Sequence, residues 1–268
     1  MAAYDAVKDL DVIHDHTVFG PLYARQYAHP AIVTTNHGPF TEDARALYAR
    51  IGETAAVVAI SHHQRAQAPE VPVARVIHHG IHLSDFPAGT GDGGYLLFLG
   101  RMAPEKGVHR AIRVAQRSGI PLLIAAKMRE QDECDYFHEL VEPQLGRSIQ
   151  YVGEANKEER KELLRSARAL IDPIRWPEPF GLVMIEAMAC GTPVIVFPEG
   201  AAPEIVEHGI TGFICADEDN MLDAVTHIDD IERSACRAAV ETRFSAERMT
   251  RDHIDLYTDL LESGVPAP

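Results

Sequence analysis

Short apolar runs recur along the whole chain and alternate with stretches of helical pattern. Ten such runs stand on the two sides of a glycine-rich break at 89–94: 11–14, 31–35, 56–60 and 73–77 before it, and 95–99, 121–126, 149–152, 169–171, 193–197 and 212–215 after it. Helical patterns separate them, for example at 108–117, 157–166 and 181–189. Strands and helices that alternate at this spacing predict an α/β fold built on doubly wound parallel sheets. Ligands of such sheets bind at the carboxyl ends of the strands.

The segment from Glu178 to Glu186 carries the most specific chemistry. Pro179 and Gly181 break regular structure just before an apolar helical run, so Glu178 is expected in a turn and Glu186 about one and a half turns into the helix. The free backbone N–H groups at the start of this helix can hold an anion. Carboxylates on both sides of that anion suit a sugar nucleotide, in which a diphosphate separates sugar from ribose. The alternative is a capping Glu178 and a solvated Glu186.

Several segments, in order, resemble the motifs of retaining glycosyltransferases of family 4, which have the GT-B fold. The segment Glu178 to Glu186 resembles the E-x7-E signature of that family. The stretch 99–107, with Arg101 and Lys106, resembles its phosphate-contacting loop, and 151–154 resembles its nucleobase loop. The glycine-containing turns at 200–206 and 211–213 complete the series. Several motifs in the family's order are a stronger signal than one short pattern.

The resemblance implies a role for each matching residue. Arg101 and Lys106 would neutralise the leaving diphosphate, Glu178 would bind sugar hydroxyls, and Glu186 would bind the ribose diol. His16, at the His-x-His end of the stretch 11–16, would contact the donor sugar from the opposing domain, or else would only satisfy backbone groups at a strand end. The leaving phosphate would itself take the acceptor's proton, so no separate general base is assigned. Further donor contacts are expected from Lys127, Gly153, Glu154, Phe180, Gly181 and Leu182.

The resemblance also predicts two Rossmann-like domains that face a cleft. Residues 1–83 would form a partial, acceptor-side domain, because the family has about three more strands before this point. Residues 84–268 would form the nucleotide-sugar-binding domain, whose final helix crosses back to the first. The runs 11–14, 31–35 and 56–60 are apolar enough for burial on both faces. With the earlier strands absent, an open sheet edge is expected, and through it a possible homodimer.

Composition narrows the class of protein. Asp and Glu number 40 against 25 Lys and Arg, a formal net charge of −15, which argues against a nucleic-acid partner and against a polybasic membrane patch. No apolar run is long enough to span a bilayer, and no signal peptide precedes the first strand. The four cysteines lack paired spacing, so we expect free thiols, no zinc site and a cytoplasmic location. Because Arg101, Lys106 and a helix N-terminus can neutralise a diphosphate, neither a metal nor a cofactor is expected.

These observations predict a metal-independent retaining glycosyltransferase. It would transfer a hexose such as glucose from a uridine or guanosine diphosphate sugar to an acceptor that the residues do not identify. Two alternatives remain open. The chain could be a nucleotide-sugar-binding fragment with weak or no transfer activity, because part of its acceptor domain is missing. It could also be a disaccharide phosphorylase of the same family, which would cleave with inorganic phosphate and need no nucleotide.

Overall fold

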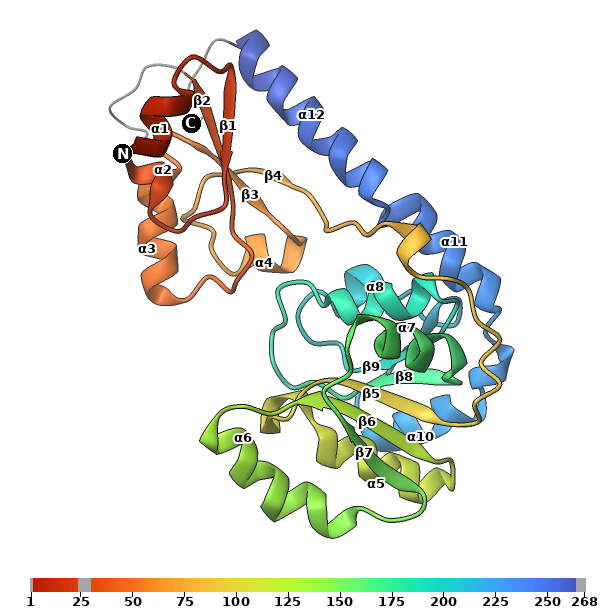
Figure 1. Ribbon diagram of the computed structural model, residues 1–268. Helices are drawn as coiled ribbons and strands as arrows, with labels where there is room; N and C mark the ends of the chain where they lie inside the picture. The colour runs from red at the N-terminus through yellow and green to blue at the C-terminus, as the bar shows by residue number, and fades with distance from the viewer. Residues whose placement is uncertain (1, 24–29, 264–268) are drawn as a thin grey trace. The chain divides into compact units, whose positions relative to one another are not determined.

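The computed structural model describes residues 2–23 and 30–263, and contacts divide the chain into two compact units (Figure 1). Unit 1 takes in the residues up to Gly80 and those from Ala246 onwards, and unit 2 runs from Ile81 to Ser245. The domain boundary predicted from the sequence lies at residue 83. Each unit contains a parallel sheet with helices, so the predicted α/β class is confirmed.

Unit 1 is built on a four-stranded parallel sheet in the order β1-β2-β3-β4. Its strands are β1 (Val12–Asp15), β2 (Ala31–Thr35), β3 (Ala56–Ala59) and β4 (Val73–Val76). Its helices are α1 (Ala2–Val7), α2 (Gly20–Tyr23), α3 (Glu42–Ile51), α4 (His62–Ala66) and α12 (Ala246–Ser263). All four strands lie within one or two residues of the predicted apolar runs.

Side chains of the unit 1 strands alternate between two hydrophobic clusters, as the pleat of a strand requires. On one face, Ile32 packs in a cluster with Tyr48 and Ile51 of α3. On the other face, Val33 packs in a cluster with Leu256 of α12. The last helix of the chain therefore covers one face of the first sheet.

Strand β1 is less buried than its neighbours, in agreement with the open sheet edge expected from the sequence. All four of its residues are half-buried, whereas β3 is fully buried and β2 is buried except at Ala31. The physical reason is position, because β1 is an edge strand that pairs only with β2 among the described residues.

Unit 2 is built on a six-stranded parallel sheet in the order β10-β9-β8-β5-β6-β7. Its strands are β5 (Leu96–Arg101), β6 (Leu122–Lys127), β7 (Ile149–Gly153), β8 (Ala169–Asp172), β9 (Val194–Val196) and β10 (Gly212–Ile214). The order of strands reverses between β5 and β8, which pair side by side although two strands separate them in sequence. Such a topological switch point opens a crevice at the carboxyl ends of its two strands.

Helices cover both faces of the unit 2 sheet (Figure 1). Helices α5 (Val108–Ser118) and α10 (Glu218–Thr226) contact each other on one face, and α8 (Leu182–Ala189) contacts α7 (Lys157–Ser166) and α11 (Arg233–Arg243) on the other. The remaining helices are short: η2 (Leu83–Asp85), η3 (Pro104–Lys106), α6 (Gln131–Tyr136), the π-helix η4 (Phe137–Val141), η5 (Glu142–Gln144), α9 (Ala202–Ile205) and η6 (Ile228–Asp230). Among the described helices of both units, none is long and apolar enough to cross a membrane.

The four cysteines are free thiols, as their spacing predicts. Cys190, Cys215 and Cys236 are buried and belong to the core of unit 2. Burial raises the pKa of the Cys190 thiol to about 11, so this thiol is protonated near neutral pH and serves as a small apolar side chain.

Candidate functional site

The predicted donor residues of unit 2 gather at the carboxyl edge of its sheet, around the switch point. Arg101 is the last residue of β5, and Asp172 is the last residue of β8 beside it. Lys106 ends the short helix η3 that follows β5. Glu178 lies in the loop between β8 and α8. Two loops that leave neighbouring strands thus bring a lysine and a glutamate to one place.

Lys106 and Glu178 form an ion pair through Nζ and Oε2. Their side chains are only 19% and 26% exposed, so solvent screens this pair less than an ion pair on the open surface. The residue predicted to hold phosphate and the residue predicted to hold sugar are therefore partners of each other.

The backbone around Glu178 is fixed by a neighbouring glycine turn. The Glu178 carbonyl accepts a hydrogen bond from the Ala201 amide at 3.0 Å. Gly200 has a φ of +60°, and a Cβ atom there would collide with the backbone nitrogen and carbonyl oxygen of Glu178. Glycine is required at this position for both reasons. The turn at 200–206, which the sequence assigns to the family pattern, thus holds Glu178 in place.

Asp172 is a buried carboxylate of this site that the sequence analysis did not select. It is 9% exposed. Burial raises the pKa of its carboxyl group to about 7, against the opposing effect of Lys106 and with a further rise from Glu178. The sequence contains one signal for Asp172: it is a carboxylate that directly follows the apolar run 169–171. Near neutral pH this group carries a variable charge beside the Lys106–Glu178 pair.

Glu186 lies on α8 and is 8% exposed, which rules out a solvated helix face. Arg160 of α7 lies 3.5 Å from its carboxylate. Burial raises the pKa of Glu186, and Arg160 partly opposes that rise. Arg160 was missed because nothing in its spacing links α7 to α8. The structure thus holds Glu186 as a buried, paired carboxylate.

The start of α8 has the geometry expected of an anion-binding helix N-terminus. Gly181 has a φ of +96° immediately before the helix, and the first backbone N–H groups of α8 follow it. Phe180 is buried and makes an edge-on ring contact with Phe244 at 6.0 Å, whereas Leu182 is 45% exposed. Phe180 therefore anchors the loop, and Leu182 presents an apolar side chain at the surface of unit 2.

The remaining predicted donor residues lie at neighbouring strand ends, and two of them, Arg101 and Glu154, form ion pairs. Arg101 pairs with Glu105 at 2.6 Å and with Glu133 at 3.3 Å. Glu154, directly after β7 and Gly153, pairs with Arg129 at 3.0 Å. Lys127 is the last residue of β6. These residues share one edge of the sheet, and their roles in binding remain predictions.

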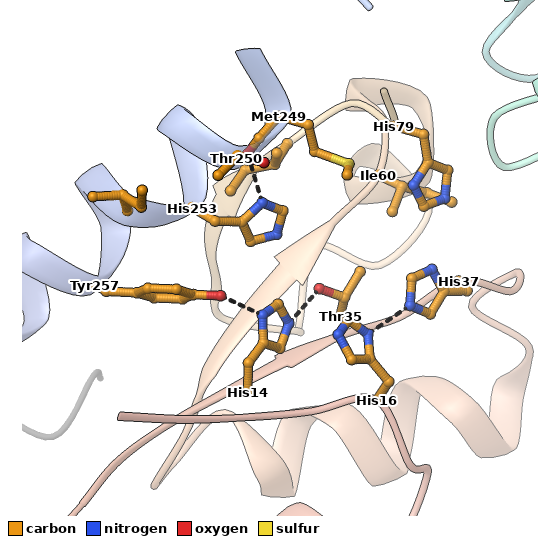
Figure 2. Close-up of a pocket in the computed structure, with 12 residues that line it drawn as sticks. His14, His16, Thr35, His37, Ile60, His79, Met249, Thr250, His253 and Tyr257 are labelled. Carbon is orange, nitrogen blue, oxygen red and sulfur yellow. Dashed lines mark hydrogen bonds between the residues drawn. The ribbon is translucent and has the colours of Figure 1, made fainter. Parts of the chain in front are cut away.

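His16, the predicted sugar contact, belongs to unit 1 and lines a pocket there (Figure 2). We call this the histidine pocket, of about 320 Å³, and its polar lining consists of His14, His16, His37, His79 and His253 with Thr35, Thr250 and Tyr257. His16 Nδ1 lies 2.8 Å from His37 Nε2. From the sequence only His16 was expected in a binding role, because its partners in the pocket come from segments far apart in the chain.

Residues 86–247 match the family model described as glycosyl transferases group 1. This chain belongs to that family. Among curated relatives, it is 34% identical over 196 residues to a protein named glycogen synthase from Mycobacterium tuberculosis, covering 69% of this chain and 46% of the relative. It is 29% identical over 185 residues to the D-inositol 3-phosphate glycosyltransferase of Mycolicibacterium smegmatis, covering 62% of this chain and 42% of that relative. The chain thus spans about half the length of these relatives.

Solved structures show the same fold for this glycosyltransferase-family chain. Sucrose-phosphate synthase from Thermosynechococcus elongatus superposes with a TM-score of 0.83 at 23% identity, covering 98% of this chain and 76% of that one. Anabaena HepE, in complex with UDP and glucose, superposes with a TM-score of 0.81 at 20% identity, covering 97% and 81%. These likenesses confirm the predicted GT-B type of fold, with two parallel-sheet domains.

Proposed function

We propose that the chain is part of, or is, a retaining glycosyltransferase that binds a nucleotide diphosphate sugar in unit 2. The observation that carries this proposal is the Lys106–Glu178 pair at the switch point between β5 and β8. It places a cation and a carboxylate where a parallel sheet binds its ligands. Membership of the glycosyl transferases group 1 family supports the same reaction class.

Donor binding would exchange the partners of this pair. The diphosphate takes the Lys106 ammonium group, helped by the N-terminus of α8 and by Arg101. Glu178 is thereby released and can accept hydrogen bonds from sugar hydroxyls. Glu186, buried on α8, would accept from the ribose diol. Without a donor, Lys106 and Glu178 bind each other. When the donor binds, its diphosphate replaces Glu178 at Lys106, and its sugar hydroxyls replace Lys106 at Glu178.

The transfer step then follows from the charges. The bond between the anomeric carbon and the phosphate oxygen breaks, and its electron pair stays on the diphosphate. Lys106 and Arg101 stabilise this developing negative charge. The acceptor oxygen forms the new bond on the same face, and its proton passes to the leaving phosphate oxygen. Since these cations supply the neutralising charge, we propose transfer without a metal ion.

UDP-glucose is the first donor to test, because the structural neighbour HepE is also known in complex with UDP-glucose. A calorimetric titration of the full chain should show saturable binding. Lys106→Ala should weaken it by roughly 10- to 100-fold, or about 1.5–3 kcal/mol, as for a lost charge-assisted hydrogen bond. Arg168→Ala is the matched control: this residue pairs with Asp229 at 2.7 Å near the amino end of β8, on the opposite edge of the sheet.

Equal affinity of wild type and Lys106→Ala would place the donor site elsewhere. Donor binding without turnover toward any acceptor would favour the binding-fragment alternative. Cleavage of a disaccharide that depends on inorganic phosphate, without any nucleotide, would favour the phosphorylase alternative. Loss of turnover in excess chelator, restored by Mg²⁺, would overturn the metal-independent mechanism.

A further inference from the structure

The histidine pocket of unit 1 concentrates one kind of titratable group. His14 lies near the end of β1, and His16 directly follows that strand. His37 follows β2, His79 follows β4, and His253 lies on α12. The first four form a continuous series of stacked rings, with centroid separations of 4.2 Å for His14–His16, 5.1 Å for His16–His37 and 5.3 Å for His37–His79. The ring of His253 lies 5.2 Å from that of His14 (Figure 2). Four separate segments have to fold together to build this arrangement.

The charged side chains around the pocket are already bound to other groups. Asp15 accepts hydrogen bonds from the Tyr4 hydroxyl at 2.6 Å and from the Thr17 amide at 2.7 Å. Arg248 of α12 pairs with Asp252 at 2.7 Å and donates to the backbone carbonyls of His78 and His79. The pocket is therefore lined by imidazoles with no carboxylate in the lining of the described residues. In a chain of net charge −15, this local composition is unusual.

Three of the imidazoles, those of His14, His37 and His79, disfavour protonation. Burial, then the neighbouring His16, His253 and His37, lower the pKa of His14 to about 3. Burial, then His37, His253 and Arg248, lower the pKa of His79 to about 4. Burial, then His16 and His253, lower the pKa of His37. A protonated His14 would face three other imidazoles, and Asp15 opposes the fall in its pKa less than any of the lowering causes. An anion in the pocket would remove that obstacle.

Hydrogen-bond stereochemistry points in the same direction. His253 Nδ1 lies 2.8 Å from the Met249 carbonyl oxygen, and because a carbonyl only accepts, this nitrogen carries the hydrogen. His253 Nε2 is then an acceptor while the ring is neutral and becomes a donor once the ring gains a proton. The close His16–His37 pair shares one N–H between two nitrogens, which leaves an outward N–H on one of the two rings. An oxyanion, which only accepts, thus meets one donor at once and others on proton uptake.

We propose that the histidine pocket binds an oxyanion, a carboxylate or a phosphate-like group, and that it takes up a proton as it does so. The volume of about 320 Å³ and the apolar lining by Ile60, Ile77 and Met249 suit a monosaccharide-sized acid. We assign this oxyanion to the acceptor, which makes the acceptor substrate an acid. That assignment rests on the proposed transferase function, whereas binding of the anion itself does not.

The test uses probes whose own charge is constant between about pH 6 and 8. Sulfate represents the phosphate-like source, glucuronate the carboxylate source, and glucose is the uncharged control. Each is titrated into the full chain without nucleotide, in two buffers of different ionisation enthalpy, so that the heat difference gives the protons taken up. We expect sulfate or glucuronate to bind with uptake of about one proton, and affinity to rise up to about tenfold per unit fall in pH.

The variants His253→Gln and His37→Gln should each weaken anion binding by fivefold or more. His138→Gln is the matched control, because His138 is an exposed histidine of unit 2 that pairs with Glu142 at 2.8 Å. If a pocket variant fails to fold, proton uptake by the wild type still tests the proposal: uptake on anion binding supports it, and binding without uptake contradicts it. Tighter binding of sulfate identifies a phosphate-like group, and tighter binding of glucuronate identifies a carboxylate.

Three results would overturn the proposal: no saturable binding of either anion, binding without proton uptake, or glucose binding as tightly as glucuronate. UDP-glucose affinity is measured on the same samples. Anion binding without any nucleotide-sugar binding would retain the oxyanion site and remove the proposed transferase function. Nucleotide-sugar binding without anion binding would remove the oxyanion site and leave the proposed transferase function in place.

Discussion

The two units hold their titratable groups in opposite ways. In unit 2, charges of opposite sign are paired at the edge of the sheet, as in Lys106–Glu178 and Arg160–Glu186. In unit 1, imidazoles stack on imidazoles, and the nearby carboxylates Asp15 and Asp252 are bound to other groups. We propose that the first kind of site accepts an anion by exchanging ion-pair partners, and the second kind by gaining a proton. The difference predicts that pH acts mainly on unit 1.

Acidification from pH 7 to pH 5 should give the largest effect. The folded-state pKa values of His14 and His79 are depressed, to about 3 and about 4, below an unfolded value of about 6.5. The unfolded chain therefore binds more protons, and stability is lost as pH falls below 6.5. Each histidine should cost about 2 kcal/mol of the free energy of unfolding of unit 1 at pH 5.

Unit 2 should change much less over the same range, because two of its groups oppose each other. His109, whose pKa burial lowers to about 4, costs about 2 kcal/mol at pH 5. Asp172 has a raised folded-state pKa of about 7, so the folded state binds more protons. Acidification from pH 7 to 5 therefore raises the free energy of unfolding of unit 2 by about 2 kcal/mol through this group. Hydrogen exchange in increasing urea at both pH values measures each unit separately. Equal loss in both units would contradict the comparison.

Gly200→Ala should give the next largest effect, confined to unit 2. The new Cβ atom combines a left-handed backbone with a collision against the backbone of Glu178, and we expect a loss of about 3 kcal/mol in unfolding free energy together with weaker UDP-glucose binding. Gly209→Ala is the matched control. It has a φ of +79° but open space around the new Cβ, so it should cost only about 1 kcal/mol. Similar costs for both variants would mean that contact with Glu178 is unimportant.

Asp172→Asn should give the smallest effect, visible only above neutral pH. Ionised Asp172 places a negative charge near Lys106, where the diphosphate would bind. Wild-type affinity for UDP-glucose should therefore fall between pH 6 and pH 8, by about fivefold or 1 kcal/mol. The variant should keep a constant affinity and match the wild type at pH 6. A wild type without this pH dependence, or a variant that retains it, would show that Asp172 does not act on the donor site.

The strands of both units could be predicted from the sequence, but their order within each sheet could not. The ten strands follow from apolar runs of strand length, and the gathering of Arg101, Lys127 and Glu154 at one edge follows from the rule that parallel strands end together. The order of strands is not local information, so the neighbouring positions of β5 and β8 could not be derived. Asp172 was missed for that reason, since its importance depends on the loop that carries Lys106.

The histidine pocket illustrates a second limit. His14 and Tyr257 are 243 residues apart in sequence, yet His14 Nδ1 lies 2.7 Å from the Tyr257 hydroxyl. No periodicity within one segment signals a contact between the first sheet and the last helix. A single histidine at a strand end could be recognised from sequence, but a series of stacked rings could not, because its members come from three segments.

The central claim is that the nucleotide sugar binds in unit 2, at the loops that follow β5 and β8. Hydrogen exchange of the full chain, with and without saturating UDP-glucose or GDP-glucose, tests it most directly. The account predicts that at least one donor slows exchange in residues 101–107 and 173–186, and leaves residues 42–60 of unit 1 unchanged. Slower exchange confined to unit 1, or none in unit 2 with either donor, would contradict it.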